Sequence, residues 1–178
     1  MNTDQPSTWF CWVISSVHQV EVNLSANFVV RDSIQDPIIG AEIALVLNRI
    51  LAPNEALEQV PAYLFDIVMH DGTRVGQIDL RLGNSESLKM YGGQLGYGID
   101  RPFRGRGFAA EACLLLKQVA LEVGFEELWI TCNPDNIASI KTCEKIAAKY
   151  IELVDVPQNS ELWHRGDREK LRFLWRLN

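Results

Sequence analysis

The segment Arg101 to Ala109 constrains this chain more than any other, because three arginines and two glycines stand directly before a helical pattern. A strand-like run ends just before the segment, and apolar residues at helical spacing continue from about Gly105 to Val123. The free N–H groups and the dipole at a helix N-terminus favour an anion, and glycine lets the backbone approach that anion closely. Because the net charge of the chain is −6, this local cluster of arginines predicts a ligand that carries phosphate.

Three interpretations of this loop compete. The run from Gly105 to Ala110 matches the dinucleotide fingerprint G-x-G-x-x-A. That fingerprint needs an acid near the end of the next strand, about 20 residues on, whereas Glu126 and Glu127 begin that strand. The arginines are also compatible with a solvated helix start that binds nothing. The third interpretation is a loop that holds the pyrophosphate of coenzyme A.

Hydrophobic periodicity and turn signals predict a single domain with strands first and helices interleaved later. The link His70-Asp71-Gly72-Thr73 is a hairpin signal, whereas the four glycines between residues 92 and 98 are unusual for a strand. Helices are expected at residues 38–51, 105–123 and 137–148, and strands at 20–30, 62–69, 74–82, 88–99, 127–132, 150–156 and 170–177. We expect residues 1–178 to form one domain, with residues 1 to about 16 as an N-terminal extension.

Composition excludes several classes of protein. An acidic chain of 178 residues lacks the basic face of a nucleic-acid-binding protein, and no apolar stretch predicts a membrane span or a signal peptide. We therefore expect a cytoplasmic protein that binds neither nucleic acid nor membrane. The four cysteines, Cys11, Cys113, Cys132 and Cys143, form no C-x-x-C pair and are predicted to be buried. The three histidines are isolated from one another, so no metal site is expected.

Two motifs together resemble the GNAT superfamily of N-acetyltransferases. The run Arg104 to Ala109 is similar to its acetyl-CoA signature [Q/R]-x-x-G-x-[G/A], and Asn136 to Ser139 resembles its second block, N-x-x-S, at the start of the next helix. One helix and one strand separate the two motifs, as in the GNAT fold. The resemblance covers roughly residues 60 to 155 and is strongest with a poorly characterised bacterial branch. It implies a three-layer α/β (mixed α+β) domain whose mostly antiparallel sheet has splayed central parallel strands flanked by helices.

The resemblance also implies a cosubstrate and the residues that hold it. Acetyl-CoA would lie with its pantetheine arm along the backbone of Ile99 and Arg101, and with its pyrophosphate on the amides of Arg104, Gly105, Arg106, Gly107, Phe108 and Ala109. Asn136 would reach the pantetheine, with Ser139 close by. From the residues alone, Asn136 is equally a helix cap and Ser139 an ordinary helix residue.

The family's chemistry is direct attack of an amine on the thioester, and two departures from its pattern bear on this chain. The second-helix tyrosine that protonates the thiolate in many members corresponds here to Cys143, and the strand before the loop holds no acid. The base would be an ordered water or a carboxylate such as Asp79 or Asp66. The sequence therefore predicts an N-acetyltransferase that acts on a small-molecule or peptide amine and that could form a homodimer. The alternative is a degenerate domain that binds CoA or a partner protein without turnover.

Overall fold

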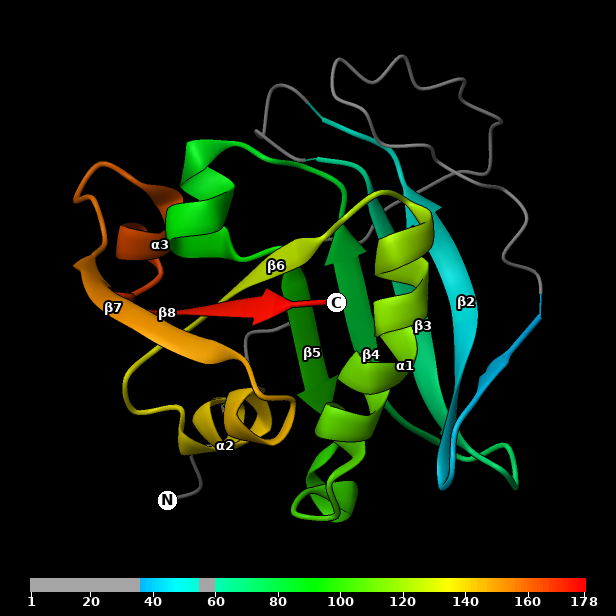
Figure 1. The fold of residues 1–178 in the computed structure, drawn as a ribbon. Helices are drawn as coiled ribbons and strands as arrows, with labels where there is room; N and C mark the ends of the chain where they lie inside the picture. The colour runs from blue at the N-terminus through cyan, green and yellow to red at the C-terminus, as the bar shows by residue number, and fades with distance from the viewer. Residues whose placement is uncertain (1–35, 55–59) are drawn as a thin grey trace.

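The computed structural model describes residues 36–54 and 60–178 (Figure 1). The strand expected at residues 20–30 and the proposed N-terminal extension lie outside these ranges, as does Cys11. The strands are β1 (Ile38–Ile39), β2 (Ile43–Leu51), β3 (Ala62–Met69), β4 (Arg74–Arg81), β5 (Leu95–Ile99), β6 (Glu127–Cys132), β7 (Lys149–Asp155) and β8 (Glu169–Arg176). The α-helices are α1 (Phe108–Glu122), α2 (Ile137–Lys145) and α3 (Glu161–His164). A π-helical turn spans Leu88–Gly92, and a 3-10 turn spans Arg101–Phe103.

The larger sheet has the order β1-β2-β3-β4-β5, with every neighbouring pair antiparallel. Because side chains alternate across a strand, the register separates two faces. Leu45, Phe65 and Ile78 lie on the face that packs against α1, and all three are buried. The opposite face carries polar residues, among them Asp66 and Asp79. The predicted hairpin between β3 and β4 is confirmed, with Gly72 in a left-handed conformation (φ 85°).

The helix predicted at residues 38–51 is wrong, because this segment forms β1 and β2. Apolar residues at positions 39, 43, 47 and 50 fit helical spacing, but Ile43 and Leu45 also alternate at strand spacing, and both are fully buried. Strand β2 pairs with β3 from Ile43 opposite Met69 to Leu51 opposite Ala62, and this pairing supplies hydrogen-bond partners for the backbone of the segment. Tertiary pairing therefore decided between two periodicities that the sequence allows.

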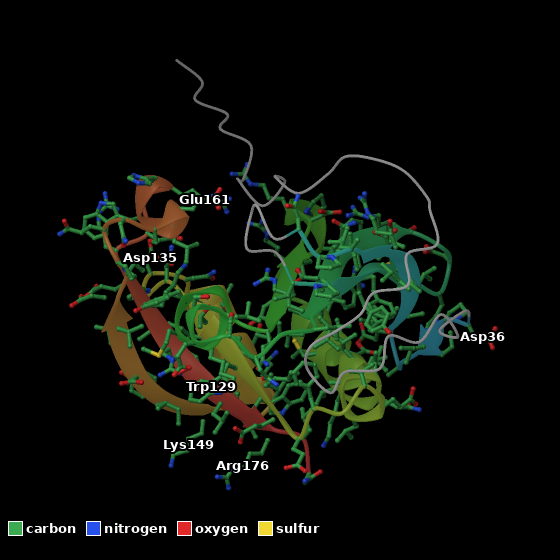
Figure 2. The ribbon with its side chains drawn as sticks, turned by 90° about the horizontal axis from the view of Figure 1, so that it is seen from above. Asp36, Trp129, Asp135, Lys149, Glu161 and Arg176 are labelled. Carbon is green, nitrogen blue, oxygen red and sulfur yellow. The ribbon has the colours of Figure 1, made fainter. Side chains whose placement is uncertain are left out.

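The smaller sheet has the order β6-β8-β7 and is also antiparallel. Seen at 90° to the first view, the two sheets lie side by side, with the three-stranded sheet on the side of α3 (Figure 2). Asn136 caps α2 by accepting a hydrogen bond from the backbone N–H of Ser139 at 3.1 Å. Trp175 and Phe173 of β8 join the same apolar core as α1 and the larger sheet, so one core unites both sheets.

The two sheets meet at the start of β5 and diverge from there (Figure 1). The backbone N–H of Gln94 donates to the carbonyl of Trp129 at 2.7 Å, and the Gln94 side chain accepts from the Trp129 N–H at 2.9 Å. Beyond this contact, β5 and β6 belong to separate sheets, joined through the loop and α1. The strand expected at residues 88–99 is therefore correct only for β5, because Leu88–Gly92 forms the π-helical turn.

Helix α1 lies across one face of the larger sheet (Figure 1) and is tied to its edge by Glu111. The Glu111 carboxylate accepts a hydrogen bond from the backbone N–H of Glu42 at 2.9 Å. A Cβ on Gly40 would stand 2.5 Å from the same carboxylate, so glycine permits this close approach. The result is a mixed α+β fold with antiparallel sheets flanked by helices, in agreement with the predicted fold class.

Candidate active site

The loop before α1 presents a row of backbone donors. Gly105 and Gly107 are left-handed (φ 80° and 90°), a conformation that turns the chain from the 3-10 segment into the helix. Within the part of the chain that the structure describes, the backbone N–H groups of residues 105–109 have no hydrogen-bond partner. These N–H groups precede a 15-residue helix, whose dipole adds partial positive charge at the same place. This arrangement of free amides could bind an anion.

Two arginines of the loop contact neighbouring groups of the protein. The Nε of Arg104 donates to the carbonyl of Ile99 at 2.8 Å, and the Arg106 guanidinium lies 4.6 Å from the centre of the Phe108 ring. A pantetheine arm that pairs with this carbonyl would therefore share it with Arg104 or displace Arg104. Arg101 begins the 3-10 turn and is exposed. In this structure the site's donors are thus chiefly backbone amides.

One cation near the loop was missed by the sequence analysis. The Nζ of Lys145, the last residue of α2, lies 3.6 Å from the point where a Cβ on Gly107 would stand. Among the described residues, the Lys145 ammonium has no ion-pair partner. No local pattern predicts this placement, because 38 positions separate the two residues and a lysine that ends a helix is ordinary. Lys145 therefore adds a positive charge beside the row of free amides.

Helix α2 brings Ser139, the serine of the N-x-x-S block, close to β5. The side-chain oxygen of Asn136 is engaged in the helix cap. The Ser139 hydroxyl lies 2.9 Å from the hydroxyl of Tyr97, which projects from β5. The Tyr97 oxygen is also 3.9 Å from the Sγ of Cys143. A hydroxyl pair thus bridges β5 and α2 where the two sheets diverge.

The groups around this bridge are buried and keep their protons. Burial raises the pKa of Cys143 to about 12, although its contact with Tyr97 acts in the opposite direction. Burial also raises the pKa of Tyr97 well above its ordinary value. Cys113, Cys132 and Cys143 are all buried and free, as predicted. Neutral hydroxyl and thiol groups therefore line this part of the site.

The opposite face of the larger sheet places a carboxylate against a glycine of β5. Asp79 pairs in register with Gly96, and its Oδ1 lies 2.5 Å from the point where a Cβ on residue 96 would stand. The other oxygen of Asp79 forms an ion pair with Arg81, with 2.9 Å between Oδ2 and Nε. Arg81 in turn donates to the carbonyl of Gly93 at 3.0 Å. Side chains of β4 thus fill the space over β5 that its own side chains leave empty.

Asp66, the other carboxylate that the sequence singled out, has several partners. It accepts hydrogen bonds from Arg74 at 2.8 Å, from Asn48 at 2.6 Å and from Gln77 at 3.0 Å. Burial by itself would raise the pKa of Asp66, but these hydrogen bonds and the charge of Arg74 lower it overall. The Asp66 carboxylate therefore stabilises the sheet. Of the two carboxylates, Asp79 is better placed to act as a base.

Solved structures of the same fold are acetyltransferases. A protein assigned as a ribosomal-protein-serine acetyltransferase from Vibrio cholerae matches with a TM-score of 0.55 and 18% identity, over 79% of this chain and 97% of that one. The ribosomal-protein-S5-alanine acetyltransferase of Vibrio fischeri matches with a TM-score of 0.52 and 14% identity, over 66% and 62%. The microcin C7 self-immunity acetyltransferase MccE, in complex with acetyl-CoA and AMP, matches with a TM-score of 0.50 and 19% identity, over 65% and 61%. The matches cover less than two thirds of the last two proteins. These likenesses define the class as the acetyltransferase fold.

The sequence itself matches the model of the acetyltransferase (GNAT) domain over residues 25–149, and the chain belongs to this family. It is accordingly an acetyltransferase, with acetyl-CoA as its cosubstrate. The free amides of residues 105–109 fit the phosphates of that cosubstrate. No curated protein matches the chain.

Two further findings concern the described residues alone. No helix among them is both long and apolar enough to cross a membrane. In the same ranges, no three side chains of histidine, cysteine, aspartate or glutamate are grouped so that they could hold a metal ion.

Proposed function

We propose that this protein transfers the acetyl group of acetyl-CoA to a primary amine by direct attack, without a covalent enzyme intermediate. The observation that carries the proposal is the row of unpartnered amides at residues 105–109, with Asp79 on the polar face of the adjoining strands. The amides suit the cosubstrate's phosphates, and the carboxylate suits a cationic acceptor. Acetyl-CoA and the amine could thus approach β5 from its two sides.

The residues at the loop would hold the cosubstrate. The amides of Gly105, Gly107 and Phe108 would bind the pyrophosphate, with Lys145 adding charge. The arm would run along the free side of β5, past Ile99 and Arg101, and Ser139 would lie close to it from α2. A backbone N–H near Ile99 would stabilise the oxyanion that forms on the thioester carbonyl.

On the opposite face, Asp79 would receive the acceptor as an ammonium ion. Gly96 has no side chain, so the Asp79 carboxylate lies directly against the backbone of β5 on this face. The ammonium must lose a proton before its nitrogen can attack. We infer that a water held by Asp79 takes this proton, since the second oxygen of Asp79 is bound by Arg81.

The names of two similar solved structures suggest a class of acceptor to test. Both act on ribosomal-protein serine or alanine. We infer that a peptide N-terminal amine is the first acceptor class to test for this chain, with small-molecule amines as the second.

The test is an acceptor panel with acetyl-CoA, in which released thiol is followed. The panel contains peptides that begin with serine or alanine, the same peptides with a blocked N-terminus, a lysine side-chain amine and a polyamine. Thiol release that requires a free amine supports the proposal. Acetyl-CoA binding without thiol release for any amine would instead support a degenerate, binding-only domain.

The pH dependence is a second check on direct attack. An α-amino group has a pKa of about 8, so the rate should rise from about pH 6 to pH 9 as the free amine forms. A rate that is flat over this range, with chemistry limiting, would contradict attack by a free amine.

A further inference from the structure

When the acetyl group is transferred, the sulfur of the cosubstrate needs a proton. Among the described residues, Tyr97 is a suitable donor beside the path proposed above for the cosubstrate arm. Tyr97 lies on β5 between Gln94, where the sheets meet, and Ile99, where the loop begins. An arm that starts at the loop and follows β5 toward the junction of the sheets passes Tyr97. The Tyr97 side chain is directed toward α2, on the face of the sheet away from Asp79.

The geometry points to the Tyr97 hydroxyl as the proton donor to the departing thiolate of CoA. This inference rests on the proposed function. Ser139 holds the phenol oxygen at 2.9 Å, so the hydroxyl is positioned by a partner on a different element. The Tyr97 hydroxyl also donates to the Ser139 carbonyl, at 3.4 Å. When the sulfur of CoA is present, the hydroxyl can donate to the sulfur in place of this carbonyl.

The other protonated group at this place is less suited to the role. The Cys143 thiol is fully buried and lies behind the phenol, 3.9 Å from its oxygen. Tyr97 keeps some exposed surface, whereas Cys143 has none. Because burial raises the pKa of Tyr97, the phenol keeps its proton over the whole range in which an amine can attack.

When the tetrahedral intermediate collapses, the C–S bond breaks and its electron pair remains on sulfur. The Tyr97 O–H proton passes to that sulfur, the Ser139 hydroxyl proton passes to the Tyr97 oxygen, and solvent returns a proton to Ser139. The acceptor nitrogen loses one proton before it attacks and a second from the tetrahedral intermediate. One of these two protons is balanced by the proton that sulfur gains, and the other is released to solvent.

The experiment compares Tyr97→Phe with Tyr150→Phe, a control whose side chain is 51% exposed on β7. Tyr97→Phe keeps the ring and removes only the hydroxyl. We expect kcat to fall about 10²-fold or more, while the KM for acetyl-CoA changes by less than about twofold. Tyr150→Phe should match the unmodified protein in both constants.

A second measurement detects the hydrogen bond without turnover. The thiolate of bound CoA absorbs in the ultraviolet, so its titration yields the pKa of the thiol on the protein. This pKa should be about one to two units higher in Tyr97→Phe than in the unmodified protein, because the thiolate has lost a donor.

The outcomes are distinct. A lower kcat with a higher thiol pKa supports the assignment. An unchanged kcat, or a lower kcat with an unchanged thiol pKa, overturns it while leaving the proposed function intact. Failure of the unmodified protein to bind CoA overturns both.

Discussion

The carboxylate of Asp79 occupies the space that a side chain on residue 96 would need, and this relationship is possible because residue 96 is glycine. A Cβ there would stand 2.5 Å from Asp79 Oδ1 and 2.8 Å from Arg81 Nη2. Both atoms end flexible side chains, so an added methyl group would displace them at little cost to the fold. This face of β5 can therefore be disturbed without unfolding the protein.

Gly96→Ala should lower turnover about as much as Asp79→Asn does, by roughly 10²-fold, if Asp79 serves the acceptor. Gly98→Ala is the matched control, because a Cβ there meets nothing within 4 Å. Steady-state rates, with the midpoint of thermal unfolding recorded alongside, check this. Full activity of a folded Gly96→Ala protein would remove Asp79 from the mechanism.

Gly107→Val should abolish the stabilisation that acetyl-CoA gives against thermal unfolding, because a branched side chain would occupy the anion's place. Gly72→Val is the control, since Gly72 is also left-handed, with open space around its Cβ position, and lies in the hairpin between β3 and β4. Both variants should lose stability through backbone strain, by about 1–2 kcal/mol. Arg104→Ala should reduce the thermal shift without removing it. A full shift in Gly107→Val would place the phosphates elsewhere.

Lys145→Gln should weaken acetyl-CoA binding about two- to fivefold, a modest loss because the lysine is exposed. The difference from the unmodified protein should shrink as salt is added, since added ions screen an exposed charge. Lys149→Gln removes an equal charge from an exposed lysine on another element, β7, and should leave affinity unchanged. Titration calorimetry at two salt concentrations measures both effects. Equal affinities for the two variants would contradict a contact with the phosphates.

Ala147→Gly should raise the free energy of unfolding by about 1 kcal/mol, because Ala147 is left-handed (φ 58°) just after α2. Two hydrogen bonds hold the turn: Ala147 N–H to the Glu144 carbonyl at 3.0 Å, and Ala148 N–H to the Cys143 carbonyl at 2.9 Å. This is the helix end that glycine favours. Ala148→Gly, at a buried position without left-handed φ, should destabilise instead. Urea unfolding compares the two, and a destabilised Ala147→Gly protein would contradict the strain argument.

Asp66→Asn should destabilise the protein at neutral pH, by about 1 kcal/mol, and the difference should disappear in acid. The folded state lowers the pKa of Asp66 from its ordinary 3.8, so the stabilisation is complete above that value. It is lost as the pH falls below 3.8 through the folded-state pKa, where the carboxylate of the unmodified protein is protonated. Urea unfolding at several pH values between neutrality and about pH 3 measures this. A difference that persists at the acid end would assign the effect to packing.

Elements whose signals are local could be predicted from the amino-acid sequence alone. The glycines before α1, the Asp71-Gly72 turn and the cap at Asn136 each act within a few residues. The turn into α1, the hairpin and α2 could therefore be predicted. The tertiary structure decided everything that depends on distant neighbours. Residues 43–51 form a strand because β3 pairs with them, although their spacing also suits a helix. Lys145 beside Gly107, Tyr97 against Ser139, and Asp79 over Gly96 join different elements, and contacts across elements depend on how the core packs.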